Sequence, residues 1–262
     1  MNIALVSLDQ IWENKIANLK QCDSYTKKSS ENGVDLIIFP EMTLTGFSMN
    51  ATLIGEQEEC SNTVDEFKKL AKKYCIAIVF GVVFHGQDRD TNNLIFITKN
   101  GRLGSKYAKI HPFSYSGEDK VYKGGNEIST QSFMDVDIGL TICYDLRFPE
   151  LYSALGVTCD IVINIANWPK KRINHWRALL KARAIENQYF CIGVNRTGVD
   201  GNGLKYEDSS VIYNANGELL ESRNIGNKIS VFNVDKNWTK SFKKTFKTTQ
   251  DRRLSLYSKF YK

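Results

Sequence analysis

Several kinds of segment are missing from this sequence, and each absence excludes a class of protein. None of the six cysteines belongs to a Cys-x-x-Cys pair, so neither a structural zinc site nor a disulfide framework is predicted. No apolar run approaches the roughly eighteen residues of a membrane span. Met1 leads directly into a strand pattern without the regions of a signal peptide. We therefore expect a cytoplasmic protein with reduced thiols and no membrane contact.

Linkers, repeats and low-complexity stretches are also missing, and the chain has only four prolines. Its 262 residues are 42% hydrophobic and 24% charged, as in an ordinary globular protein with a substantial core. Much of the excess behind the formal charge of +6 lies near the C-terminus, without an aromatic-basic recognition pattern for nucleic acid. The sequence predicts one domain and no nucleic-acid partner.

Alternating strands and helices predict an α/β fold with a mixed sheet covered by helices. The expected helices are 13–31, 63–74 and 174–187, the first with Ile16, Leu19 and Tyr25 on one face and the second with Thr63 as N-cap. A hairpin is expected at the Asn-Gly turn of residues 99–102 and another at 214–217. The expected strands are 2–8, 35–40, 76–84, 91–98, 104–108, 161–166, 189–194 and 229–234.

The most informative stretch is 138–150, an apolar strand followed by a turn into a helix. Cys143 lies on the bend, where α/β enzymes expose nucleophiles and where backbone N–H groups can stabilise a developing negative charge. The alternative is that Cys143 is a small buried hydrophobe. Asp145 and Glu150, close by, are expected to cap or pair locally.

Two further reactive groups lie at strand ends, Glu41 after Pro40 and Lys109 after the second hairpin strand. If the three ends converge, the carboxylate accepts the thiol proton and the ammonium stabilises an oxyanion. Taken alone, Glu41 could be an exposed turn residue and Lys109 a solvated lysine. His111 is the rival base, because a Cys-His pair commonly activates a thiol. His85 and His175 have no metal-ligand spacing and are expected to be structural.

The segments around these groups resemble the catalytic blocks of the nitrilase, or carbon–nitrogen hydrolase, superfamily. The blocks are PE-x3-TGF at 40–47, Y-x-K-x-H-x-F at 107–113 and CYDLRFPE at 143–150. NWP at 167–169, HW at 175–176, ARAIENQ at 182–188 and NR-x-G-x-DGNG at 195–203 continue the resemblance. It extends to about residue 235 and is greatest to the omega-amidase branch. Pro112 departs from the pattern but removes no functional group.

The resemblance implies a four-layer αββα sandwich and a Glu41, Lys109, Cys143 constellation, with Glu118 helping to position the lysine and the substrate. It implies release of ammonia from the side-chain amide of a 2-oxo acid, such as 2-oxoglutaramate or 2-oxosuccinamate, through a cysteine thioester. No metal or organic cofactor is implied.

Such a substrate carries a carboxylate, which a guanidinium recognises well. Arg147 and Arg172 are the candidates, although Arg147 could instead brace the turn through an ion pair. Trp168 and Phe47 are candidate pocket walls or core residues, and Tyr144 is a candidate through its backbone N–H. The same constellation also fits an N-carbamoyl amino acid amidohydrolase or a nitrilase. A different class, a non-catalytic relative that binds a small acid or a protein, would not need all three groups.

The resemblance also implies a homodimer. We expect residues 1–235 to form the hydrolase domain and 236–262 to form a tail that packs on this domain or on the dimer interface. The tail is basic but richer in apolar side chains than a free tail should be. These side chains are Phe242, Phe246, Leu254, Leu256, Tyr257, Phe260 and Tyr261.

Overall fold

The computed structural model describes residues 1–246 and 248–260. Its two large sheets are stacked face to face. Lys247, Tyr261 and Lys262 of the predicted tail lie outside the described residues. The first sheet has the order β13 (Ser222–Gly226), β14 (Ile229–Asn233), β1 (Asn2–Val6), β2 (Leu36–Ile38), β3 (Ala77–Phe84), β4 (Thr91–Ile97) and β5 (Leu103–Ala108). The second has the order β12 (Val211–Tyr213), β9 (Phe190–Asn195), β8 (Ile161–Ala166), β7 (Val136–Ile142) and β6 (Thr130–Phe133).

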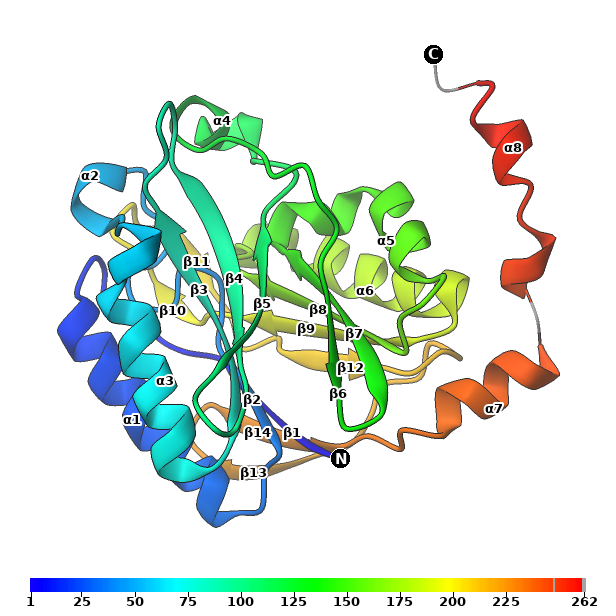
Figure 1. The fold of residues 1–262 in the computed structure, drawn as a ribbon, viewed down its shortest axis with the longest axis horizontal. Helices are drawn as coiled ribbons and strands as arrows, with labels where there is room; N and C mark the ends of the chain where they lie inside the picture. The colour runs from blue at the N-terminus through cyan, green and yellow to red at the C-terminus, as the bar shows by residue number, and fades with distance from the viewer. Residues whose placement is uncertain (247, 261–262) are drawn as a thin grey trace.

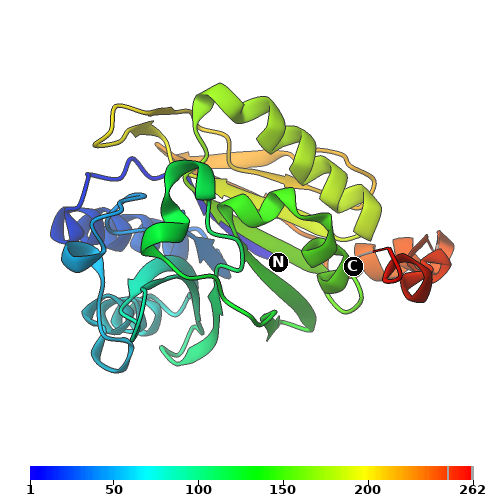
Figure 2. The same ribbon diagram turned by 90° about the horizontal axis from the view of Figure 1, so that it is seen from above.

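Helices cover the outer face of each sheet. Helices α1 (Lys15–Glu31) and α3 (Asn62–Tyr74) pack on the first sheet, and α5 (Pro149–Leu155) and α6 (Ile173–Asn187) pack on the second (Figure 1). Figure 2 shows the two helical layers on opposite sides of the sheets. Ile3 and Leu36 of the first sheet share one buried cluster with Ile138 and Ile163 of the second. The predicted αββα sandwich with mixed sheets is therefore confirmed.

The central strands form where the chain is apolar on both faces. All six residues of β8 are buried, as expected for a strand between a helical layer and a second sheet. Each large apolar side chain buried in this way contributes roughly 1.5–3 kcal/mol to folding. Among the described residues, no helix combines the length and the apolar character that a membrane span requires.

Two details of the predicted helices were wrong. In α1, Ile16 is 85% exposed, whereas Leu19 and Tyr25 of the predicted face are partly buried against the core. The fully buried residues of the helix are Asn18, Cys22, Thr26 and Ser29. These small side chains allow close packing, and the Asn18 amide donates to the Ile11 and Leu44 carbonyls. The N-cap of α3 is Ser61, because the Thr63 hydroxyl donates to Glu56 instead.

The hairpin of β4 and β5 forms at the predicted Asn-Gly turn. The predicted hairpin at 214–217 is limited to one β-bridge, between Tyr213 and Leu219. Just beyond it, β13 and β14 form a hairpin that was not predicted. Also not predicted were the short β10 (Gly198–Val199) and β11 (Lys205–Tyr206), and the single-turn helices α2 (Ala51–Ile54) and α4 (Glu118–Val121).

The tail forms α7 (Trp238–Thr245) and α8 (Leu254–Tyr257), which lie beside the body on the side away from α1 and α3 (Figure 1). The Trp238 ring packs 5.7 Å from that of Phe190. The Arg252 guanidinium donates to the Ser153 carbonyl and hydroxyl at 3.1 and 2.7 Å and to the Asn187 side-chain oxygen at 2.6 Å. The tail thus contacts the α5–α6 layer.

Candidate active site

Three strand ends bring the predicted reactive groups toward one region. Strands β1, β2 and β3 are parallel, whereas β4 is antiparallel to β3 and β5 is antiparallel to β4. Strand β5 therefore runs in the same direction as β2. Glu41, which follows β2, and Lys109, which follows β5, consequently emerge at the same edge of the first sheet.

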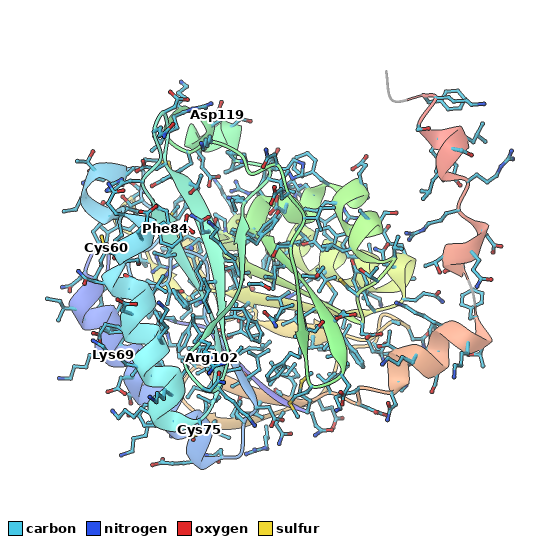
Figure 3. The ribbon with its side chains drawn as sticks, viewed as in Figure 1. Cys60, Lys69, Cys75, Phe84, Arg102 and Asp119 are labelled. Atoms are coloured by element: carbon cyan, nitrogen blue, oxygen red, sulfur yellow. The ribbon has the colours of Figure 1, made fainter. Side chains whose placement is uncertain are left out.

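Glu41, Lys109 and Glu118 form a buried ionic cluster. The Lys109 Nζ lies 3.0 Å from the Glu41 Oε1 and 3.0 and 2.8 Å from the two Glu118 carboxylate oxygens. The three side chains are at most 1% exposed. Glu118 opens α4, and Figure 3 marks this helix by the next residue, Asp119.

The charges in this cluster support one another. Burial alone would lower the pKa of Lys109, but the carboxylates of Glu118 and Glu41 outweigh it and raise that pKa, so the amine stays charged. Burial raises the pKa of Glu118, against the opposing effect of the Lys109 ammonium. Lys109 therefore serves as a permanent positive charge and not as a proton acceptor.

Cys143 lies on a strained bend directly after β7. Its φ of +47° is in the left-handed region, which costs a residue with a Cβ about 1–3 kcal/mol. Its neighbour Asn167 follows β8, and the Asn167 backbone N–H lies 2.9 Å from the Glu41 Oε2. Burial and the negative charge of Glu41 raise the pKa of the Cys143 thiol well above its usual value, while Lys109 acts in the opposite direction. The thiol is consequently protonated at neutral pH.

The rival base, His111, has a different partner. Its Nδ1 lies 2.8 Å from the Asp145 Oδ1, and its ring stacks on Phe148 with the centroids 3.7 Å apart. Asp145 also accepts hydrogen bonds from the Ile142 backbone N–H and the Tyr107 hydroxyl. Asp145 thus connects the end of β5 to the bend at Cys143 through hydrogen bonds, and His111 is one of its partners.

A cleft of about 470 Å³ opens to solvent beside Cys143. All five predicted substrate-binding residues line it, namely Phe47, Tyr144, Arg147, Trp168 and Arg172. Phe113, Ser116, Asn167, Pro169, Leu204 and Tyr206 complete the lining. The walls are therefore largely aromatic, with two guanidinium groups among them.

The two arginines are held by rings. The Arg147 guanidinium lies 5.0 Å from the Trp168 ring centroid and 3.1 Å from the His175 Nδ1, and that of Arg172 lies 5.3 Å from the Phe113 ring centroid. Neither guanidinium has a carboxylate partner within the part of the chain that the structure describes. The ion pair considered for Arg147 does not form there.

Three amide side chains at the site were given no role by the sequence analysis, although Asn167 belongs to its NWP block. Asn92 donates to the Glu41 and Glu118 carboxylates at 2.8 and 3.1 Å, Asn167 donates to the Glu41 carbonyl at 2.7 Å, and Gln10 donates to the same carbonyl at 2.9 Å. A signal existed for the first of these. Asn92 lies at the start of β4, just before the apolar run of that strand, and a polar residue buried in a strand needs a polar partner.

The remaining cysteines lie away from the cleft, since only Cys143 is among its lining residues. All six are free thiols, and Figure 3 shows the exposed Cys60 and Cys75 near the two ends of α3. Within the described ranges, no group of three or more His, Cys, Asp or Glu side chains is arranged to hold a metal ion.

Comparison with known proteins identifies the family. The family model described as carbon-nitrogen hydrolase matches residues 2–244. The chain belongs to the carbon–nitrogen hydrolase family. Members of this family are hydrolases that act on carbon–nitrogen bonds, and this is the class of enzyme to which the chain belongs.

Relatives in this family include proteins with named activities. The chain is 30% identical to "Hydrolase in agr operon" of Staphylococcus aureus over 98% of its own length and 100% of the relative. It is 33% identical to the omega-amidase YafV of Yersinia enterocolitica over 84% and 83% of the two chains. The 2-oxoglutaramate amidase of Bacillus subtilis is 31% identical over 75% and 76%.

A solved structure of the family has the same fold. The CN-hydrolase superfamily protein XC1258 of Xanthomonas campestris superimposes with a TM-score of 0.88 at 28% sequence identity, covering 96% of this chain and 97% of the other. A carbon–nitrogen hydrolase fold thus accounts for nearly the whole chain.

Proposed function

We propose that this hydrolase releases ammonia from the side-chain amide of a small 2-oxo acid, such as 2-oxoglutaramate or 2-oxosuccinamate. The observation that carries the proposal is the cleft itself. It joins Cys143, beside a buried Glu41–Lys109 pair, to two guanidinium groups without carboxylate partners among the described residues. The omega-amidase and 2-oxoglutaramate amidase relatives support the same substrate class.

In the first half of the reaction, the Cys143 sulfur attacks the amide carbon. Because the thiol is protonated at rest, Glu41 accepts its proton as the carbon–sulfur bond forms. The Lys109 ammonium and the Tyr144 backbone N–H stabilise the oxyanion. Glu41 then returns the proton to the departing nitrogen, the carbon–nitrogen bond breaks, and ammonia leaves a thioester on Cys143.

In the second half, water replaces the sulfur. Glu41 takes a proton from a water molecule as its oxygen attacks the thioester carbon, and Lys109 again balances the oxyanion. The carbon–sulfur bond then breaks, the sulfur regains the proton from Glu41, and the dicarboxylic 2-oxo acid departs. Glu118 holds the ammonium of Lys109 in place throughout, through both of its carboxylate oxygens.

The far end of the substrate carries a carboxylate. We assign its recognition to Arg147 and Arg172, whose planar guanidinium groups suit a carboxylate. Phe47 and Trp168 form aromatic walls around the carbon chain between the two ends. A nitrile or an N-carbamoyl amino acid could react at the same thiol, so these compounds belong in the test.

Ammonia release tests the proposal. Wild type and Cys143→Ala are compared on 2-oxoglutaramate, 2-oxosuccinamate, glutamine, asparagine, an N-carbamoyl amino acid and a simple nitrile. We expect rapid turnover of the 2-oxo amides by wild type only. Preferred turnover of the carbamoyl compound or of the nitrile would refute the substrate assignment, and ammonia release by Cys143→Ala would refute the nucleophile.

We also propose that the enzyme is a cytoplasmic homodimer. A reducing compartment keeps Cys143 available as a thiol. The tail supports the dimer, since it presents Leu254 at 58% and Phe260 at 80% exposure beside the α5–α6 layer, and apolar side chains gathered on a surface favour association.

A further inference from the structure

Asn92 of β4 links the two carboxylates of the ionic cluster. Its side chain is 1% exposed, and its amide nitrogen lies 2.8 Å from the Glu41 Oε1 and 3.1 Å from the Glu118 Oε1. An amide nitrogen carries two hydrogens, so it can donate one to each carboxylate. The backbone carbonyl of Asn92 also accepts the Lys109 backbone N–H at 2.9 Å. One residue thus contacts all three members of the cluster.

The orientation of this amide follows from its surroundings. The Asn92 Oδ1 is buried and has no donor among the described residues, and the side-chain oxygens of Asn167 and Gln10 share this property. Leaving such an oxygen unpaired is unfavourable. A flipped Asn92 would pair the oxygen no better and would turn it toward two carboxylates. All three amides therefore direct their N–H groups to Glu41 or its backbone.

The cluster needs such a donor because its charges do not balance. Two carboxylates share the single ammonium of Lys109. Two further titratable groups that interact with both carboxylates are the Cys143 thiol and the Tyr122 hydroxyl, and neither supplies a positive charge. A donor to both carboxylates stabilises their ionised forms without adding a charge. It also holds one Glu41 oxygen in place, so that Glu41 faces the bend in a fixed orientation.

We propose that Asn92 is a positioning residue that keeps Glu41 and Glu118 ionised together and orients Glu41 as the proton acceptor for Cys143. This inference rests on the proposed function, since it deepens the role of Glu41 in that reaction. Asn92 does not line the cleft, so it acts through the carboxylates and not on the substrate.

Asn92→Leu tests the role, because leucine has a similar size but no donor. We expect kcat/KM at pH 7 to fall about 10- to 100-fold, with KM nearly unchanged and with the acid limb of the pH profile about one unit higher. Activity should recover partly above that limb. Asn92→Asp should lose more activity than Asn92→Leu and should not regain it at higher pH, because the new carboxylate adds a third negative charge. Asn92→Ser keeps one hydroxyl donor and should lie between wild type and leucine.

The neighbouring Asn93 provides the matched control. It is 2% exposed on the same strand, but among the described residues its amide donates only to the Thr91 carbonyl and hydroxyl. We expect Asn93→Leu to retain the wild-type pH profile. An Asn92→Leu enzyme with an unshifted profile, or an Asn93→Leu enzyme with the same shift, would overturn the proposal. If Asn92→Leu does not fold, the smaller Asn92→Ser carries the test.

A measurement without substrate separates this inference from the proposed function. Carbon-13 NMR of protein labelled at the glutamate carboxyls follows the ionisation of Glu118, with Glu118→Gln to assign its signal. We expect the Glu118 titration to move to higher pH in Asn92→Leu and not in Asn93→Leu. An unmoved titration would overturn the role of Asn92, even if the enzyme hydrolyses 2-oxo amides. A shift in an enzyme that hydrolyses no amide would leave that role standing and refute the function.

Discussion

At the scale of single residues, the account depends on a thiol that is protonated at rest. Burial and the charge of Glu41 raise the pKa of Cys143, so the thiolate fraction at pH 7 is below that of an ordinary cysteine. We expect the rate at which iodoacetamide alkylates Cys143 to rise about tenfold per pH unit. This rise should continue at pH values at which the rate for an ordinary thiol has already levelled off. Peptide mass spectrometry measures the alkylated fraction of Cys143, with the exposed Cys60 as internal reference.

The same experiment separates nucleophile from base. Glu41→Gln should still be alkylated at Cys143 at high pH, whereas its amide turnover should fall roughly 10²- to 10⁴-fold, as for the loss of a general base. If the alkylation rate of Cys143 levelled off at a lower pH than that of Cys60, the raised pKa of Cys143 would be contradicted. Wild-type turnover by Glu41→Gln would contradict the assigned base.

The arginines of the cleft give a second prediction at this scale. Replacing Arg147 or Arg172 by Met should raise KM for a 2-oxo amide about tenfold or more, because a charge-assisted hydrogen bond contributes about 1.5–3 kcal/mol. Turnover of an uncharged amide such as propionamide should change little. Arg177→Met is the control, since Arg177 pairs with Glu207 and does not line the cleft. Equal losses on both amides would mean that the arginines only support the fold.

At the scale of elements, close packing of β3 fixes the segment that carries Glu41. A Cβ added to Gly81 would lie 2.3 Å from the Met42 backbone nitrogen, closer than any real contact. Met42 itself has a φ of +46°. We expect Gly81→Ala to displace this segment and to lower kcat by up to about a hundredfold, since a shift of 1 Å at a catalytic group can cost that much.

Gly226→Ala is the control for this substitution. The three atoms nearest to its Cβ would all belong to the flexible Lys28 side chain, which can move aside. The measurements are kcat and the thermal midpoint of each variant. Wild-type kcat in a folded Gly81→Ala enzyme would show that the packing of β3 does not position Glu41.

The sequence predicted the elements that bury apolar side chains and missed those that do not. Strands such as β8 and the β4–β5 hairpin have apolar runs or an Asn-Gly turn, and both were predicted. The inner face of α1 was predicted only in part: Leu19 and Tyr25 pack on the core, but Ile16 does not. Small polar residues pair there with backbone groups, which no hydrophobic pattern records. Strand β6 has alternating exposed residues and forms only because it pairs with β7.

The candidate site was likewise predicted only in part from the sequence. Motif resemblance selected Glu41, Lys109, Glu118 and Cys143, and the first three are in direct contact in the structure. Their catalytic roles remain predictions. Asn92 was missed because its importance depends on two carboxylates from distant segments, 51 and 26 residues away in the sequence. Only the folded chain brings these groups together.

At the scale of the whole molecule, the tail leaves several large apolar side chains exposed in a single chain. Phe246, Leu254 and Tyr257 are 60%, 58% and 45% exposed, although Arg252 between them is bound to the body. We expect a chain that ends at Phe246 to sediment as a monomer at concentrations at which the full chain is a dimer. Lys259→Ala, which removes no apolar surface, should remain dimeric. An unchanged dimer after truncation would exclude the tail from the interface.

The central claim is that Cys143 forms a thioester with the 2-oxo acid. Rapid mixing of the enzyme with 2-oxoglutaramate, acid quenching and mass spectrometry of the peptide that contains Cys143 test it directly. The account predicts a mass increase equal to the substrate minus ammonia, which appears within one turnover on wild type and never on Cys143→Ala. Ammonia release at full rate without any adduct on Cys143, or an adduct on another residue, would contradict it.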